Sequence, residues 1–140
     1  MRELTITVPG LPPKEFDPNG RGHHMARHRA SVQAHSDVIA LVREQGWHGP
    51  AMDKAEITLA WGYNKSRNRD SDNFLARSKP LIDGLTRAEV IVDDSAQHVT
   101  YNLVGFYKAK QNETVITVKE QSTINANITG RSRKQQARLA

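Results

Sequence analysis

The amino-acid sequence predicts an α+β fold, in which two helices pack on a small mixed β-sheet. Two observations predict this class, and a third excludes a membrane protein. The 140 residues suffice for one hydrophobic core and are too few for two. Segments of alternating apolar and polar residues are interspersed with two segments of helical periodicity, in the order β-α-β-α-β-β-β. No stretch approaches the roughly 20 apolar residues of a membrane-spanning helix, so the sequence excludes an integral membrane protein.

The first third of the chain predicts a strand, a loop and a helix. Residues 4–8 alternate between apolar side chains and threonines, which indicates a half-buried strand ending at Pro9. Residues 14–28 show no apolar period and are therefore predicted to be a loop. Residues 30–45 are predicted to be a helix that stops at Gly46. The apolar face of this helix comprises Ala34, Val38, Leu41 and Val42.

The middle of the chain predicts a second strand and a second helix. Apolar residues alternate through residues 55–63, as in a strand, and the polar residues 64–70 follow as a connection. A helix is expected to begin near Asp72. Pro80 has no amide hydrogen and restricts the residue before it, so this helix is expected to break or kink there.

Three further strands are predicted after the second helix. Val90–Val92 is a short apolar strand that ends at Asp93. Residues 99–107 and 114–119 are predicted to form a hairpin around residues 110–112. No internal repeat and no second core are apparent.

The charge of the chain divides it into a body and a tail. The net charge is +5, from 20 basic and 15 acidic residues. Residues 121–140 contain four basic residues and no acid, which leaves +1 for residues 1–120. We therefore predict one domain over residues 1–120 and a basic, mobile tail over residues 121–140, which could add non-specific affinity for phosphates.

Two features predict a protein of the cytoplasm. The N-terminus lacks the apolar stretch of a secretion signal. The sequence has no cysteine, which excludes disulfides, thiolate zinc sites and a cysteine nucleophile.

Two acidic groups indicate a metal site. Asp70 and Asp72 are two residues apart, so their side chains point to the same side of an extended segment. If residues 90–92 lie beside that segment in the sheet, Asp94 arrives at the same end. Three converging carboxylates repel one another unless a cation lies between them, and oxygen ligands favour Mg²⁺, with Mn²⁺ as a substitute. The alternative is structural, because helix caps and turns are the common uses of aspartate. In that alternative Asp72 is the N-cap of the second helix.

Basic residues beside the carboxylates favour a phosphodiester substrate. Lys65, Arg67 and Arg69 alternate with polar residues, which in an extended conformation gives a basic edge next to an acidic one. Cations position phosphates, and a metal ion can then hold one of them. A second basic segment is interpreted as a phosphate clamp. It contains Arg21, His23, His24, Arg27, His28 and Arg29, of which Arg21, His24, Arg27 and Arg29 are predicted to bind DNA.

Three blocks of residues, in order, resemble the RusA-type Holliday-junction resolvases. The first is Arg69-Asp70-Ser71-Asp72-Asn73-Phe74-Leu75, the second Lys79-Pro80-Leu81-Ile82-Asp83-Gly84-Leu85, and the third Val90-Ile91-Val92-Asp93-Asp94-Ser95. The opening segment Ile6-Thr7-Val8-Pro9-Gly10-Leu11-Pro12-Pro13 is also similar to the family's first strand and Pro-Pro turn. The resemblance covers about residues 4–107 and not the tail.

The resemblance implies a small homodimeric, Mg²⁺-dependent endonuclease that is encoded by a bacterium or a phage. It would resolve four-way DNA junctions by paired symmetric nicks in recombination and repair, leaving 5′-phosphates. Asp70, Asp72 and Asp94 would bind the metal. No membrane and no small-molecule cofactor are expected. The alternative is a DNA-binding protein of the same fold that does not cleave, or a nuclease without preference for junctions.

The catalytic lysine departs from the family pattern. The family's position, four residues after the second aspartate, is Ala76 here. The family lysine also precedes its helix aspartate by four residues, and Lys79 precedes Asp83 by four. Lys79 therefore takes the role of the catalytic lysine if three residues are inserted between Asp72 and Lys79. The alternative candidate is Arg77. Asp83 is expected to form a salt bridge with Lys79. The supporting residues around the carboxylates are Asn73, Asp83 and Asp93.

Overall fold

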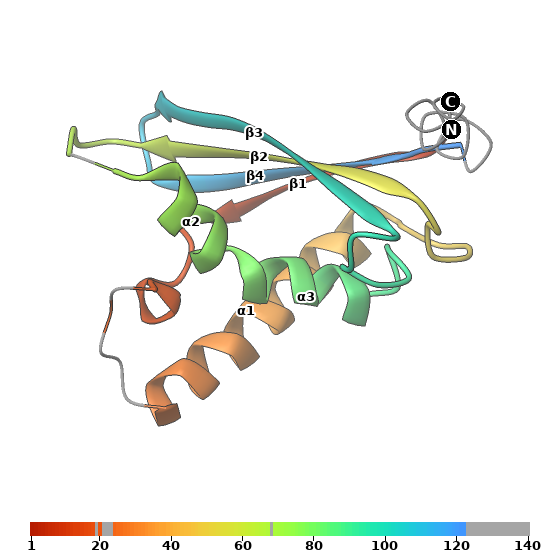
Figure 1. Cartoon of the computed structure of the whole chain (residues 1–140), viewed down its shortest axis with the longest axis horizontal. Helices are drawn as coiled ribbons and strands as arrows, with labels where there is room; N and C mark the ends of the chain where they lie inside the picture. Colours follow the sequence, from red (N-terminus) through yellow and green to blue (C-terminus); the bar gives the residue numbers. More distant parts are fainter. Residues whose placement is uncertain (19, 21–23, 68, 123–140) are drawn as a thin grey trace, which may run out of the picture.

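The computed structural model describes residues 1–18, 20, 24–67 and 69–122. Figure 1 shows the sheet and the helices in two layers, with the helices on one face of the sheet. The elements, in chain order, are β1 (Glu3–Pro9), the short 3₁₀ helix η1 (Lys14–Phe16), α1 (His24–Glu44), β2 (Ala55–Tyr63), α2 (Ser71–Arg77), α3 (Lys79–Arg87), β3 (Val99–Lys108) and β4 (Glu113–Glu120). The α+β class and the mixed sheet are thereby confirmed.

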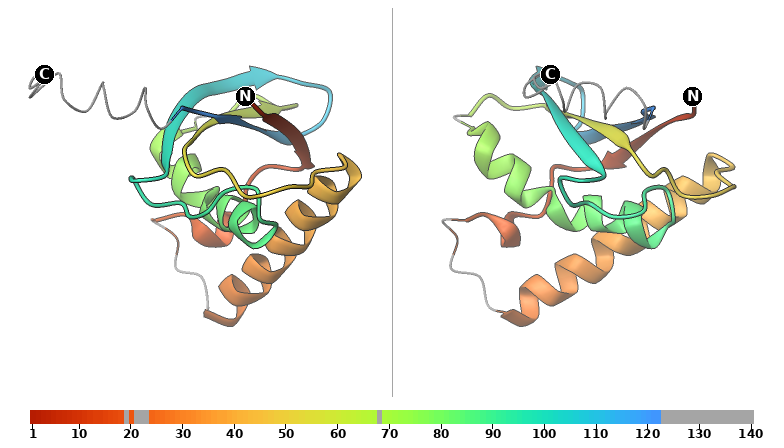
Figure 2. Two further views of the ribbon diagram at one scale, coloured as in Figure 1. Left: turned by 90° about the vertical axis from the view of Figure 1, so that its right-hand side faces the viewer. Right: turned by 45° about the vertical axis from the view of Figure 1, so that its right-hand side comes forward.

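The sheet has the strand order β1-β4-β2-β3 within the described residues. β4 pairs antiparallel with both β1 and β2, whereas β2 and β3 run parallel because α2 and α3 connect them. The two views of Figure 2 show the helices on the same face. The predicted hairpin is therefore wrong: β3 and β4 form where expected, but β2 lies between them. Alternation identifies strands, but it does not identify their partners.

The core lies between this face of the sheet and the helices. Alternate residues of β1, β2 and β4 are buried and face α1 and α3. Gly84 of α3 lets the two helices approach closely, since a Cβ atom there would lie 2.9 Å from the Cβ of Val38 on α1. The helix break is confirmed, because α2 ends at Arg77 and α3 begins at Lys79 with Pro80 in its first turn.

Two predictions about local structure are wrong. α1 begins at His24, within the predicted loop, and η1 lies there too. The first turns of α1 are mostly exposed and polar, so they carry no apolar period. Val90–Val92 is not a strand of the sheet: Ile91 forms a single parallel bridge with Met52, and this segment is held by bonds from the Met52 amide to Val90 O (2.8 Å) and from the Val92 amide to Met52 O (3.0 Å).

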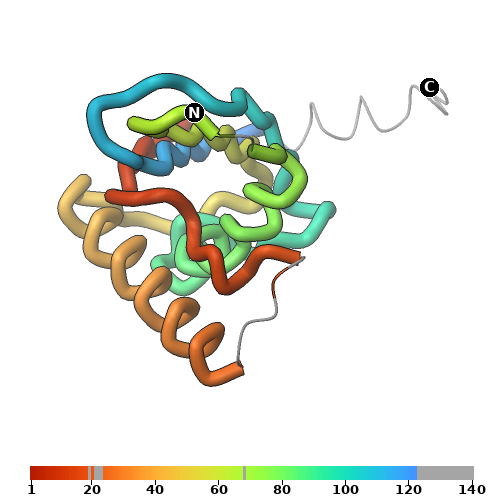
Figure 3. Tube along the Cα trace, turned by 90° about the vertical axis from the view of Figure 1, so that its left-hand side faces the viewer, coloured from red at the N-terminus to blue at the C-terminus, as the bar shows by residue number. Residues whose placement is uncertain are grey.

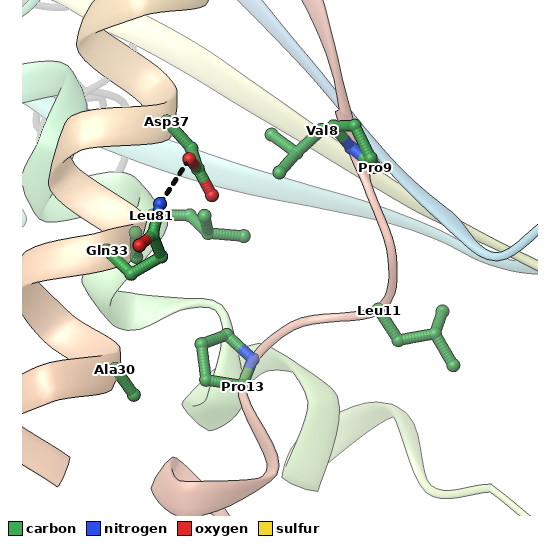
Figure 4. Close-up of a pocket in the computed structure, with 9 residues that line it drawn as sticks. Val8, Pro9, Leu11, Pro13, Ala30, Gln33, Asp37 and Leu81 are labelled. Carbon is green, nitrogen blue, oxygen red and sulfur yellow. Dashed lines mark hydrogen bonds between the residues drawn. The ribbon is translucent and has the colours of Figure 1, made fainter. Parts of the chain in front are cut away.

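An apolar hollow of about 220 Å³ lies between α1 and the proline-rich segment that follows β1. Figure 4 shows Leu81 of α3 beside it and Gln33 and Asp37 hydrogen-bonded to each other on α1 (2.8 Å). None of the site residues predicted from the sequence lines it. Of the helices described, none combines the length and the apolar character needed to cross a bilayer.

Candidate functional site

Asp70 and Asp72 lie exposed at the N-terminus of α2. Asp70 is the N-cap, with an extended backbone, and its Oδ1 accepts a hydrogen bond from the Asp72 amide (2.9 Å). The alternative assignment of Asp72 as the N-cap is therefore wrong, because Asp72 already belongs to the first helical turn. The continuous extended segment expected over these residues ends at Asp70. Both carboxylates nevertheless project from one helix end, and Asn73 follows them in the same turn.

Aromatic packing holds α2 against the sheet. The ring of Phe74 on α2 contacts Trp61 of β2 and Phe106 of β3 edge to face, with centroids 5.5 and 4.9 Å away. Ser78, between α2 and α3, is fully buried. Its hydroxyl donates to Phe74 O (2.7 Å) and accepts from the Trp61 indole nitrogen (3.2 Å). These contacts set the position of α2, and with it that of the two aspartates.

We expect Ser78→Ala to lower the free energy of unfolding by about 1–3 kcal/mol, because the buried indole N–H of Trp61 then loses its acceptor. Chemical denaturation followed by circular dichroism measures the change. Ser66→Ala, in an exposed loop, is the matched control and should be neutral. Equal stability of the two variants would contradict this role for Ser78.

Arg77 fastens α2 to the segment after β1. Its Nε and Nη2 both donate to Pro12 O, at 3.1 and 2.6 Å, and its guanidinium lies 4.2 Å from the Phe74 ring centroid. Burial lowers the pKa of Arg77, and the charges of Asp17 and Glu15 oppose this shift. Arg77 is thus occupied by contacts within the chain.

Lys79 is exposed at the start of α3. Its Nζ lies 5.7 Å from the centroid of the Tyr101 ring on β3. Burial, followed by the charge of Asp94, raises the pKa of Tyr101. Lys79 therefore contacts the ring of the tyrosine whose hydroxyl is affected by the charge of Asp94.

Asp94 does not join Asp70 and Asp72. Among the described residues, no three histidines or acidic residues are grouped closely enough to hold a metal ion. The reason is that residues 90–92 bridge to Met52 and not to the segment before α2. Figure 1 shows the first turn of α2 and the segment after α3 well separated. Beside Asp94, the Ser95 hydroxyl hydrogen-bonds Asp93 and lowers its pKa.

Asp83 does not pair with Lys79. Its Oδ2 lies 2.7 Å from His35 Nε2 on α1 and 3.1 Å from Arg87 Nε on its own helix. Burial lowers the pKa of His35, and the charge of Asp83 opposes the shift. The predicted salt bridge with Lys79 is wrong because α1 packs against α3 and offers a nearer partner. Asp83 therefore contacts α1 and does not support the carboxylates of α2.

The basic segment before α2 is folded back on itself. Arg69 Nη2 donates to Lys65 O (2.9 Å), and its guanidinium lies 4.7 Å from the centroid of the Tyr63 ring. The extended basic edge is thus wrong for Arg69, while Lys65 and Arg67 are exposed as expected. Sequence reasoning missed Tyr63, whose ring lies next to this cation.

The second basic segment is partly a helix. His24, Arg27 and Arg29 lie exposed in the first two turns of α1, and Arg21 lies outside the described residues. The Arg27 guanidinium lies 4.8 Å from the Phe16 ring centroid of η1. No acid occupies the first turn of α1. Cations at a helix N-terminus interact unfavourably with the positive end of the helix dipole. An anion bound there would offset this repulsion.

The carboxylate pair and both basic segments lie at the same end of the molecule. Figure 3 views this end, where the start of α1, η1, the start of α2 and the β2–α2 connection all face the reader. The arrangement defines an α+β protein that presents two carboxylates among cations.

Comparisons with known proteins do not name a family. No family model matches the chain. A protein of Xylella fastidiosa (strain Temecula1 / ATCC 700964), described as uncharacterized, is 29% identical over 121 residues, which cover 84% of this chain and 76% of that protein. The function must therefore be argued from the residues of the site.

Proposed function

We propose that this protein is a Mg²⁺-dependent endonuclease that resolves four-way DNA junctions by paired symmetric nicks, in recombination and repair. The observation that supports it is the position of Asp70 and Asp72, exposed at the end of the molecule that also carries the basic segments. Cations that position phosphates beside carboxylates are what phosphodiester hydrolysis requires. The resemblance of three sequence blocks to the RusA-type resolvases adds the junction as substrate.

The residues at the start of α2 fit a magnesium ion. Mg²⁺ in proteins is held by one or two carboxylates, with waters and substrate phosphates completing the shell. Asp70 uses Oδ1 for the helix cap and keeps Oδ2 for a ligand, and Asp72 is exposed. Bound there, the ion would polarise a phosphate and lower the pKa of an attacking water.

The chain's own residues would position the DNA. Lys65 and Arg67 are exposed and can contact phosphates next to the carboxylate pair. Lys79 is exposed at the start of α3, seven residues after Asp72, and in this proposal it stabilises charge that develops on the scissile phosphate. Arg77 is bound to Pro12 and is not available for this role.

The third carboxylate requires a second chain in this proposal. Among the described residues of one chain, Asp94 does not form with Asp70 and Asp72 a group that could hold a metal ion. The buried Tyr101 hydroxyl, near Asp94, has no hydrogen-bond partner among the described residues, which suits a site completed by another molecule. We propose that in a homodimer the partner's Asp94 meets Asp70 and Asp72. A two-fold dimer would then present two sites to a junction that is itself two-fold symmetric.

Incubation with a synthetic four-way junction tests the proposal. Symmetric nicks are expected with Mg²⁺ or Mn²⁺, and none with a chelator. A linear duplex of the same sequence is the control and should remain intact. Equal cutting of both substrates would leave a nuclease without junction preference, and cutting in the chelator would contradict the metal.

The second candidate is a DNA-binding protein that does not cleave. The N-cap hydrogen bond of Asp70 favours it, because this bond accounts for an aspartate without invoking catalysis. Junction binding without nicks in Mg²⁺ would establish this alternative.

A further inference from the structure

The end of β3 and the connection to β4 carry two lysines, Lys108 and Lys110, toward the candidate site. This connection passes the end of β2, where the Ala109 amide donates to Tyr63 O (2.8 Å) and the Asn64 amide donates to Asn112 Oδ1 (3.1 Å). The Gly10 amide, just after β1, donates to Asn112 O (2.8 Å). The β3–β4 connection is thereby held beside the basic segment before α2, although the bonded residues Asn64 and Asn112 are 48 positions apart in the sequence.

Tyr63 joins the two segments through its ring. Arg69 lies 4.7 Å and Lys108 6.0 Å from the ring centroid, and Lys108 Nζ also donates to Asn64 O (3.2 Å). The quadrupole of an aromatic ring attracts cations, which offsets part of the repulsion between these two charges. Lys108 keeps two of its three ammonium protons for a ligand.

The charge of this region is concentrated and exposed. Residues 63–70 and 107–113 together hold five cations and two acids, a net charge of +3, whereas the rest of residues 1–120 carries −2. One of the two acids, Glu113, accepts a hydrogen bond from the Tyr107 hydroxyl, and burial with this bond raises the pKa of Tyr107 to about 12. The other acid, Asp70, belongs to the candidate metal site. Lys65, Arg67, Lys108 and Lys110 are exposed.

We infer that Lys108 and Lys110 form, with Lys65, Arg67 and Arg69, one surface that binds the sugar-phosphate backbone of a DNA arm beside the carboxylate pair. This inference rests on the proposed function. Backbone contacts of this kind set the position of the duplex and carry no sequence preference. The sequence signal for this surface is the pair of lysines two residues apart. The strand order places the first of them, Lys108, against Tyr63 and Asn64 at the start of the basic segment.

The test compares two single variants, Lys110→Gln and Lys119→Gln, and the double variant Lys108→Gln/Lys110→Gln. Lys119 is also exposed, but it lies at the opposite end of β4 and is the matched control. Binding to a four-way junction is measured by fluorescence anisotropy over a range of monovalent salt. Each lost phosphate contact is expected to weaken binding on the order of tenfold at about 0.1 M salt and to reduce the slope of log K against log salt by about 0.9. Lys119→Gln should match the wild type.

The outcomes separate the two proposals. If the wild type does not bind the junction, the proposed function fails, and this inference fails with it. If the wild type binds and nicks the junction but the lysine variants keep the affinity and salt slope of Lys119→Gln, only this inference is wrong. Lys108→Arg keeps the positive charge and should keep the slope of log K against log salt. A reduced slope in this variant would mean that Lys108 supports the local structure and does not contact a phosphate. Circular dichroism confirms that each variant is folded.

Discussion

Asparagine in place of Asp70 or Asp72 is expected to reduce junction cleavage on the order of a hundredfold or more, because a neutral amide is a poor ligand for a hard cation. Asp70→Asn is informative, since asparagine is as good an N-cap as aspartate and the fold should be preserved. Binding to the junction should persist or tighten, because each change removes negative charge facing the phosphates. Single-turnover cleavage, a gel shift and circular dichroism give the three readouts.

Asp37→Asn is the matched control for these variants. Asp37 lies on α1, where it accepts a hydrogen bond from Gln33, and it is not part of the carboxylate pair. Its cleavage rate should equal that of the wild type. Loss of folding together with loss of binding in the Asp70 or Asp72 variants would instead show that these aspartates act only in the local structure at the start of α2.

Asp94→Asn is also expected to abolish cleavage, and mixing experiments show which chain supplies this carboxylate. A dimer of one Asp94→Asn chain and one Asp72→Asn chain retains one complete site if the partner's Asp94 is used. Such a mixture should therefore nick the junction in one strand, although each variant alone is inactive. If the carboxylate came from the same chain, both sites of the mixed dimer would be damaged and no nicks would appear.

Lys79→Ala is expected to slow single-turnover cleavage at saturating protein on the order of a hundredfold or more, the effect of removing one donor that stabilises transition-state charge. The choice of Lys79 over Arg77 stays a prediction, which rests on the bonds of Arg77 to Pro12 O. Lys79 is exposed, and its main contact is the ring of Tyr101, so its removal should change the stability little.

Arg77→Ala is expected to lower the stability by about 1–3 kcal/mol with little effect on the cleavage rate of the folded protein. Two of its guanidinium nitrogens bond Pro12 O, and its loss would leave that carbonyl and the Phe74 ring without these contacts. Denaturant titration and single-turnover kinetics on the same samples separate the two effects. A larger loss of rate for Arg77→Ala than for Lys79→Ala would show that the three-residue insertion is placed wrongly.

Patterns in the sequence predict most of the elements of the fold; the exceptions are η1, the first turns of α1 and the strand expected at residues 90–92. The alternation in residues 4–8 and 55–63 predicted β1 and β2, and Pro80 predicted the break between α2 and α3. These are local properties: side-chain direction repeats every two residues in a strand, and proline acts on its own turn. The start of α1 was missed for the same reason, because its exposed first turns have no apolar period.

The contacts between distant segments could not be predicted from the sequence and follow from the way the elements pack. The strand order places β2 between β3 and β4, which brings Lys108 beside Arg69 at the ring of Tyr63. Because α1 packs on α3, the carboxylate of Asp83 contacts His35. The bridge between Met52 and Ile91 holds the segment before Asp94 away from α2. Pairing of this kind depends on which arrangement buries all apolar faces together, and contacts between residues distant in sequence leave no periodic signal along the chain.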